Sequence, residues 1–275
     1  MKKILVPTDF SRTAHNAINY AAEFALAIQA KLMLFHVYHK PAVPAEAIIS
    51  VSEHEIGQER KKKLRIIQKN LQTKYGNKMM VEYASIHGVP IKGIVTFAEE
   101  NKVDFIIMGM EGVGYFTERL VGSISTAVIK KSICPVLIIN KHTRFRKISR
   151  IVLACNYSAI KNTSVFEPII DLVLSFQAQI HVLNIVPEEQ ELLYSVNKTV
   201  ESFKVSHLLK DVEHSFDFTK NDDVIDGIND FAEEHKMDMI VMVAQKHTLF
   251  QNLLHESNTK RMAFHARVPL LILHE

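Results

Sequence analysis

The sequence has few of the residues that usually mark special chemistry. It holds two cysteines in 275 residues, Cys134 and Cys155, and they are not spaced as a metal or redox pair. Both are expected to be small buried side chains in a reducing compartment. The net charge is only +3, from 33 basic and 30 acidic residues, so no broad basic field favours a nucleic-acid partner. The lysine run at 61–63 is expected to be a solvated helix face.

Long apolar runs are also missing. No segment approaches the roughly 18 uninterrupted apolar residues that a membrane span needs. The apolar run at the N-terminus is cut by Pro7, Thr8 and Asp9, so it is not a signal-peptide core. The sequence therefore predicts a cytoplasmic protein with no membrane partner.

Catalytic signatures are scarce. The sequence has no nucleophile elbow and no catalytic-cysteine motif. Its 14 histidines include no helical i, i+4 pair with a third ligand in view. No catalytic residue and no metal ligand is predicted.

The chain consists of two related halves. GIVTFAEENKVDFIIMG, which begins at Gly93, aligns without a gap with GINDFAEEHKMDMIVMV, which begins at Gly227. Near the start, ILVPTDFS at 4–11 corresponds to IVLACNYS at 151–158. A repeat of this length indicates duplicated structural units. We expect two domains, at 1–143 and 146–275.

Each half alternates strand-like and helical patterns. Short, nearly continuous apolar runs predict buried parallel strands in the first half at 3–7, 31–38, 79–86, 103–109 and 135–139. After Ser11, a plausible N-cap, apolar residues recur at three- and four-residue steps up to Ile28, which predicts a crossover helix. This alternation predicts doubly wound α/β domains, which bind ligands beyond the carboxyl ends of their strands.

Glycines are rare except in one segment. Four of the nine lie between 109 and 122. The segment does not fit a dinucleotide fingerprint, because Thr117 takes the third glycine position. What remains is Gly109-x-x-Gly112, nine residues, then Gly122-Ser123 at the start of a helix expected to reach Lys131. Glycines allow a close backbone approach, and a helix start presents free N–H groups, so the segment suits a polyphosphate.

With this motif the chain resembles a tandem universal stress protein. ATP-binding members of that family carry G-x-x-G, nine residues, then G-[ST]. The resemblance implies an adenine nucleotide alpha hydrolase-like fold, with a five-stranded parallel sheet in each domain and strand order 3-2-1-4-5. It also implies ATP as ligand, with or without Mg²⁺. The residues assigned to the site are Pro7, Thr8, Asp9, Val37, Gly109, Met110, Gly112, Gly122, Ser123, Ile124 and Ser125.

The resemblance also implies roles within this site. The segment 7–9 would line the adenosine pocket, the backbone near Val37 would meet adenine, and Ile124 and Ser125 would join the phosphate loop. Asp9 has a second reading, as the N-cap of the first helix. The family dimerises across the last strand, so the two halves are expected to pair through 135–139 and 269–273, with a homodimer left open.

The second half departs from the motif. In the ungapped register Val243, Lys246 and Glu256 replace Gly109, Gly112 and Gly122. Asn156 likewise replaces Asp9. A carboxylate at a helix start occupies the anion position and repels phosphate, so one ATP per chain is expected, in the first domain.

The sequence is compatible with three functions. The first is an ATP-binding protein of the stress response, acting as a regulator or adaptor. The second is a slow ATPase that uses the same loop, and the third is an interaction module whose glycines only shape a turn. The sequence favours the first, because no general base or arginine finger accompanies the loop.

Overall fold

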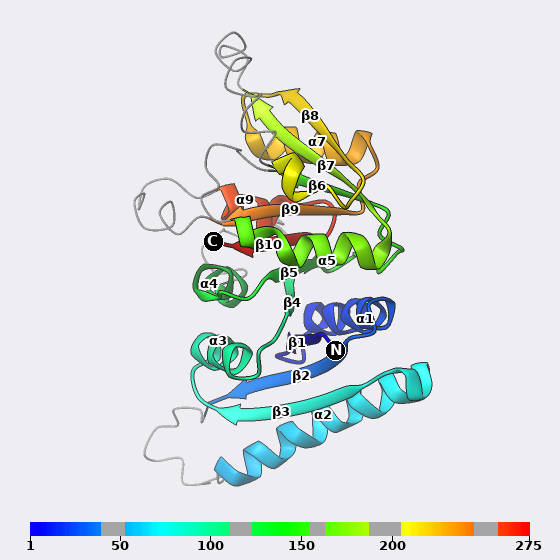
Figure 1. Ribbon diagram of the computed structural model, residues 1–275. Coiled ribbons are helices and arrows are strands. Elements are labelled where there is room, and N and C mark those ends of the chain that lie inside the picture. The colour runs from blue at the N-terminus through cyan, green and yellow to red at the C-terminus, as the bar shows by residue number, and fades with distance from the viewer. Residues whose placement is uncertain (40–52, 111–122, 155–162, 187–204, 245–257) are drawn as a thin grey trace.

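The structure is a computed structural model of the whole chain. It describes residues 1–39, 53–110, 123–154, 163–186, 205–244 and 258–275. Within these ranges it contains two similar sets of five strands (Figure 1).

The elements of the first half are β1 Lys3–Pro7, α1 Arg12–Ala27, β2 Lys31–Tyr38, α2 Glu53–Tyr75, a short 3₁₀ helix Gly76–Lys78, β3 Val81–His87, α3 Pro90–Glu100, β4 Phe105–Met110, α4 Ser123–Lys131 and β5 Val136–Asn140. Those of the second half are β6 Arg150–Ala154, a 3₁₀ helix Thr163–Phe166, α5 Glu167–Phe176, β7 Gln179–Val186, β8 His214–Lys220, α7 Val224–Glu234, β9 Met239–Ala244, α9 Asn258–His265 and β10 Leu270–His274.

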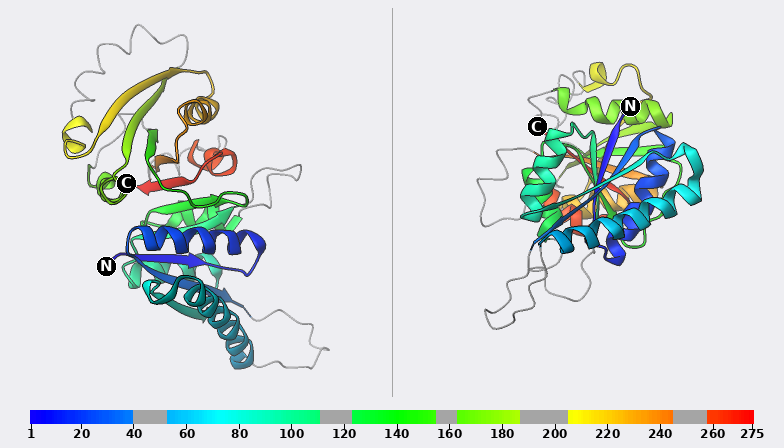
Figure 2. Two further views of the ribbon diagram at one scale, coloured as in Figure 1. Left: turned by 90° about the vertical axis from the view of Figure 1, so that its right-hand side faces the viewer. Right: turned by 90° about the horizontal axis from the view of Figure 1, so that it is seen from below.

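The ten strands form one sheet. Its order is β3-β2-β1-β4-β5-β10-β9-β6-β7-β8, so each half has the expected order of a five-stranded parallel sheet. The halves meet at an antiparallel pairing of β5 with β10, with Leu270 opposite Ile138 and Ile272 opposite Val136. The strands turn progressively against one another along the sheet, the ordinary right-handed twist (Figure 2).

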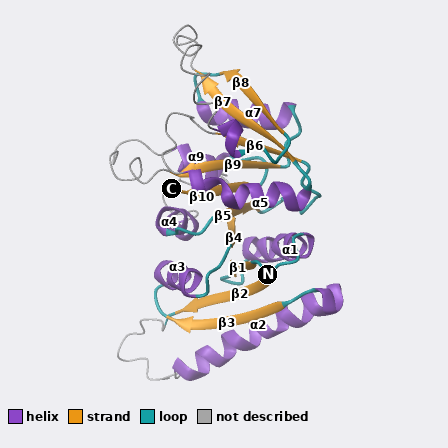
Figure 3. Cartoon of the chain, in the orientation of Figure 1, coloured by secondary structure: helices purple, strands orange, loops and turns teal. Residues whose placement is uncertain are grey.

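Helices cover both faces of this sheet (Figure 3). On one face, α1, α2 and α5 bury an apolar cluster that runs through both halves. On the other, α3, α4, α7 and α9 bury a second cluster that also spans both halves. This two-sided burial explains why the strands consist of nearly continuous apolar residues, and the predicted doubly wound α/β fold is confirmed.

Local signals in the sequence set the starts of several elements. Ser11 is the N-cap of α1, where its hydroxyl accepts a hydrogen bond from the backbone N–H of Ala14 at 3.1 Å. The reading of Asp9 as this cap is therefore wrong. The aspartates shared by the two repeats have a structural role, since Asp104 accepts from the N–H of Lys3 and Asp238 accepts from the N–H of Arg150. Each aspartate thus ties the start of one central strand to its neighbour.

The strand bounds, the starts of two helices and the burial of Cys134 agree with the sequence pattern. The five strands predicted for the first half are present within two residues of their expected bounds. The two predicted helices, α1 and α4, begin at Arg12 and Ser123. Cys134 is 7% exposed, as expected, whereas Cys155 lies outside the described residues. Within the described ranges, no helix combines the length and apolar character that crossing a membrane requires.

Candidate functional site

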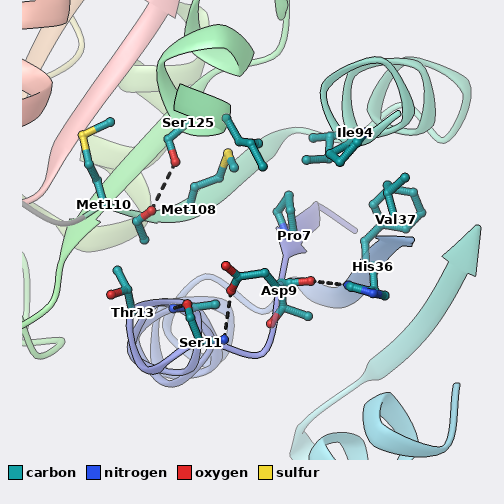
Figure 4. Close-up of a pocket in the computed structure, with 16 residues that line it drawn as sticks. Pro7, Asp9, Ser11, Thr13, His36, Val37, Ile94, Met108, Met110 and Ser125 are labelled. Carbon is teal, nitrogen blue, oxygen red and sulfur yellow. Dashed lines mark hydrogen bonds between the residues drawn. The ribbon is translucent and has the colours of Figure 1, made fainter. Parts of the chain in front are cut away.

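The first half contains a cavity of about 450 Å³ at the carboxyl ends of β1, β2 and β4 (Figure 4). The first turns of α1, α3 and α4 close its sides. Its volume lies within the roughly 300–1,000 Å³ typical of small-molecule sites. The lining residues are Pro7, Thr8, Asp9, Ser11, Thr13, Ala14, Phe35, His36, Val37, Pro90, Ile94, Met108, Gly109, Met110, Ile124 and Ser125.

The loop after β1 is held by its own hydrogen bonds. The N–H of Thr8 donates to the carbonyl of Phe35 at 2.8 Å, which continues the β1–β2 ladder. The Thr8 hydroxyl then accepts from the N–H of Phe10 at 3.0 Å, and Asp9 Oδ1 accepts from the N–H of Ser11 at 2.9 Å. Phe10 adopts a left-handed conformation with φ of 67°. The loop therefore turns sharply and leaves the carboxylate of Asp9 exposed at the mouth of the cavity.

His36 supports this loop from β2. Its Nδ1 donates to the carbonyl oxygen of Thr8 at 2.7 Å, and its ring packs on Phe10 with centroids 4.6 Å apart. Burial lowers the pKa of His36 below its ordinary value, more than the hydrogen bond to Thr8 raises it. The neutral imidazole is therefore favoured, with Nδ1 protonated.

Gly109 lies at the closest approach of β4 and α1. A Cβ atom at this position would lie 2.5 Å from the carbonyl oxygen of Thr13 and 2.8 Å from its methyl group. No side chain fits there without moving the backbone of α1. The packing of two elements of the fold is thus sufficient to require glycine at 109.

Helix α4 brings its first turn to the opposite wall of the cavity. Ile124 lines the cavity, and the hydroxyl of Ser125 donates to the carbonyl oxygen of Gly109 at 3.2 Å. Because the first N–H groups of a helix have no partner within it, this end offers donors and a partial positive charge toward the cavity.

The profile of the universal stress protein family matches residues 1–140 and, a second time, residues 147–274. The chain belongs to the universal stress protein family. The two matches account for the repeat and for the two five-stranded units of the sheet.

Known relatives of this universal stress protein match either one half or the whole chain. Universal stress protein MJ0531 of Methanocaldococcus jannaschii is 38% identical over 147 residues, which cover 51% of this chain and 82% of the relative. A universal stress protein from Archaeoglobus fulgidus has a TM-score of 0.75 at 19% identity and covers 98% of this chain and 97% of its own. A universal stress protein solved in complex with cAMP is 25% identical, with a TM-score of 0.39, and covers 51% of this chain and 97% of its own.

The structure of this family member brings most of the predicted site residues to one cavity. Eight of the eleven line it, namely Pro7, Thr8, Asp9, Val37, Gly109, Met110, Ile124 and Ser125. Ser123 begins α4, and its side chain is not described, while Gly112 and Gly122 lie outside the described residues.

Part of the cavity wall consists of residues that the motif does not indicate. His36 and Met108 line the cavity, as do Pro90 and Ile94 in the first turns of α3. The sequence does indicate the contribution of α3. Pro90 is a typical first residue of a helix, and the helix that follows β3 begins at the carboxyl edge of the parallel sheet, where the cavity lies.

The second universal stress protein unit has an ion pair between the two helices that correspond to α3 and α4. Asp223, the N-cap of α7, accepts from Arg261 of α9 at 2.7 Å. The repeat places apolar Val89 and Ala127 at these positions in the first half, between the two helices that border the cavity. The pairing with Arg261 lowers the pKa of Asp223. An ion pair thus links α7 to α9, whereas the two matching positions of the first half hold valine and alanine.

Proposed function

We propose that the first domain binds one adenine nucleotide, ATP with or without Mg²⁺, and that the chain is a nucleotide-responsive regulator or adaptor. The observation that carries this proposal is the convergence of eight predicted site residues on one cavity from segments around 7–9, 37, 109–110 and 124–125. These segments are far apart in sequence, and their meeting is the arrangement expected of a site at a topological switch point.

The apolar part of the cavity suits a base. Val37, Ile94 and Pro90 lie on β2 and α3 and provide apolar surface on one side. Adenine has apolar faces and polar edges, so it can pack on these side chains while its edge meets the backbone near Val37.

The polar parts suit a ribose and phosphates in different places. The carboxylate of Asp9 would repel phosphate but can accept hydrogen bonds from ribose hydroxyls. The start of α4, across the cavity from Asp9, offers N–H donors and the positive end of the helix dipole, which favour phosphate (Figure 4). A nucleotide is therefore expected to bind in one orientation, with its ribose near Asp9 and its phosphates near the start of α4.

A single site per chain is supported by the differences between the halves. We place the domains at 1–143 and 146–275, and the motif is complete only in the first. Val243 replaces Gly109, a position that packing on α1 restricts in the first half, and Lys246 and Glu256, outside the described residues, replace the other two glycines of the motif. The ion pair between Asp223 and Arg261 is a second difference, since the matching positions of the first half are Val89 and Ala127.

A binding role is favoured over rapid turnover by the charges at the cavity. Among the described residues that line it, none is lysine or arginine, so none can neutralise the charge that develops on a transferred phosphoryl group. We also infer that the pairing of β5 with β10 persists in solution and satisfies the apolar edges of both domains within one chain.

The test begins with freshly purified full-length protein, denatured to release and identify any nucleotide. Calorimetric titration with ATP, with and without Mg²⁺, then gives the stoichiometry, which we expect to be close to one per chain. The Gly122→Glu variant, which copies Glu256 of the second half, should remain folded and lose ATP binding. Met80→Glu is the matched control, because it adds the same charge at an exposed position away from the cavity.

Two results would contradict the proposal. Unchanged ATP affinity in folded Gly122→Glu would show that the assignment of the phosphate end is wrong. Absence of both co-purified nucleotide and titratable binding would instead favour an interaction module.

A further inference from the structure

The last strand of the second domain reaches the helix that borders the cavity of the first. His274, the final residue of β10, donates from Nε2 to the carbonyl oxygen of Ile129 in α4 at 2.7 Å. His274 is half-buried and Ile129 is 4% exposed. The C-terminal end of the chain lies beside α4 (Figure 1).

The antiparallel register explains why these residues meet. Leu270 pairs with Ile138 and Ile272 with Val136, so each step toward the end of β10 is a step toward the start of β5. His274 therefore extends past the start of β5, to the place where the chain arrives from α4. A sheet paired in any other register would carry this side chain elsewhere.

The first domain makes the reciprocal contact with a different side chain. Asn140, the final residue of β5, donates from its amide to the carbonyl oxygen of Ala266, just after α9. Asn140 and His274 are separated by the 134-residue repeat interval. Each domain thus ends its last strand with a donor that reaches the end of the other domain's last helix.

The contact of His274 acts on a short helix. Helix α4 has nine residues, and Ile129 lies in its last turn, where carbonyl groups lack partners within the helix. Four residues earlier, about 6 Å along the axis, Ser125 lines the cavity and bonds to Gly109. One end of α4 is therefore held by the first domain and the other by the second.

Helix α4 also belongs to the apolar cluster that spans both domains. Val128 and Ile129 of α4 belong to the same buried cluster as Met262 and Ala263 of α9. This cluster is continuous across the two domains, and the hydrogen bond of His274 adds a directed contact from the second domain to α4.

We propose that His274 is a positioning residue for the nucleotide site of the first domain, so that the second domain supports a site it does not itself contain. This role rests on the function proposed above. Loss of the hydrogen bond would let the last turn of α4 fray and would loosen the first turn, where phosphate donors must be held in place. The imidazole acts through Ile129 and does not touch the ligand.

The experiment compares ATP affinity in three full-length variants. His274→Ala should bind ATP about 3- to 10-fold more weakly than wild type, the effect expected for the loss of one hydrogen bond. His274→Gln retains an N–H donor and should restore affinity to within about twofold. Asn140→Ala, the matched control, removes the reciprocal contact to α9 and should leave ATP affinity unchanged.

Hydrogen exchange without nucleotide provides the second readout. Amides of residues 126–131 should exchange faster in His274→Ala than in wild type, and Gln should reverse this. Equal ATP affinity of wild type and His274→Ala would overturn the proposal. It would also be overturned if His274→Ala and His274→Gln lost the same ATP affinity and neither variant changed the hydrogen exchange of α4. If wild type binds no ATP, the proposed function fails, whereas failure of the variants alone refutes only the role of His274.

Discussion

Gly109 provides the sharpest test of how β4 and α1 fit together. The Gly109→Ala substitution adds a single methyl group. In the folded chain that methyl would lie 2.5 Å from the backbone carbonyl oxygen of Thr13, whereas ordinary contacts begin near 3.4 Å. Because the neighbour is backbone in the first turn of a packed helix, no side-chain rotation can relieve the overlap.

Gly57→Ala is a matched control for this change. Its Cβ would also meet an atom at 2.5 Å, but that atom is the hydroxyl oxygen at the end of the Tyr38 side chain, which can rotate away. Gly57 lies within α2, where alanine is intrinsically favoured over glycine by about 1 kcal/mol. In both variants the new methyl group would lie 2.5 Å from an oxygen atom, but only the oxygen near Gly57 belongs to a side chain that can move away.

The expected magnitude follows from two opposing effects. Overpacking a well-packed site costs about 1–3 kcal/mol, while replacing a strand glycine recovers about 0.5–1 kcal/mol. We expect Gly109→Ala to lower the free energy of unfolding by about 1–2 kcal/mol, or the melting temperature by roughly 2–8 °C. Gly57→Ala should be neutral or stabilising.

Urea denaturation and thermal melting of both variants, without nucleotide, measure these differences. Thr13→Ser should not rescue Gly109→Ala, since the nearest atom is the carbonyl oxygen. Unchanged stability in Gly109→Ala, combined with reduced ATP affinity, would refute the packing explanation and return Gly109 to a ligand-contacting role.

Three further predictions concern titration and reactivity. Because burial lowers the pKa of His36 in the folded chain, the unfolded chain takes up its proton more readily, so stability should fall as pH drops below about 6.5; His36→Asn should show a smaller loss between pH 8 and 5.5 in urea midpoints. Arg261→Met should lower the free energy of unfolding by no more than about 1 kcal/mol at pH 7, because the ion pair is partly exposed. The effect should be smaller at acidic pH, because the pKa of Asp223 is lowered in the folded chain and the pair is lost once the carboxylate is protonated. Burial, with a smaller effect of a nearby carboxylate, raises the pKa of Cys134 to about 12, so in a Cys155→Ser background its thiol should stay unreactive toward a disulfide reagent at pH 8 until the chain is denatured.

Much of the candidate site could be predicted from sequence, because its residues lie at the ends of recognisable elements. Asp9 follows a strand, and Ile124 and Ser125 begin a helix. The carboxyl edge of a parallel sheet gathers such positions whatever the intervening chain does. His36 was not predicted, since alternation along a strand gives no indication that its ring reaches the carbonyl of Thr8.

The sequence by itself determined the local and repeated features of this protein. Apolar periodicity set the strands and helices, and the repeat at a separation of 134 residues indicated two related units. Periodicity suffices for this because burial on one or both faces of an element restricts residues every two or every three to four positions.

Only the tertiary structure decided how distant segments touch. Glycine is required at 109 because α1 packs against it. Asp223 forms its ion pair with Arg261 of α9, and His274 bonds to Ile129 of α4, which is 145 residues away in sequence. Each contact depends on the register and spacing of elements packed on the sheet. Those distances are set by the volumes of all the side chains between the elements, and no local pattern of residues encodes them.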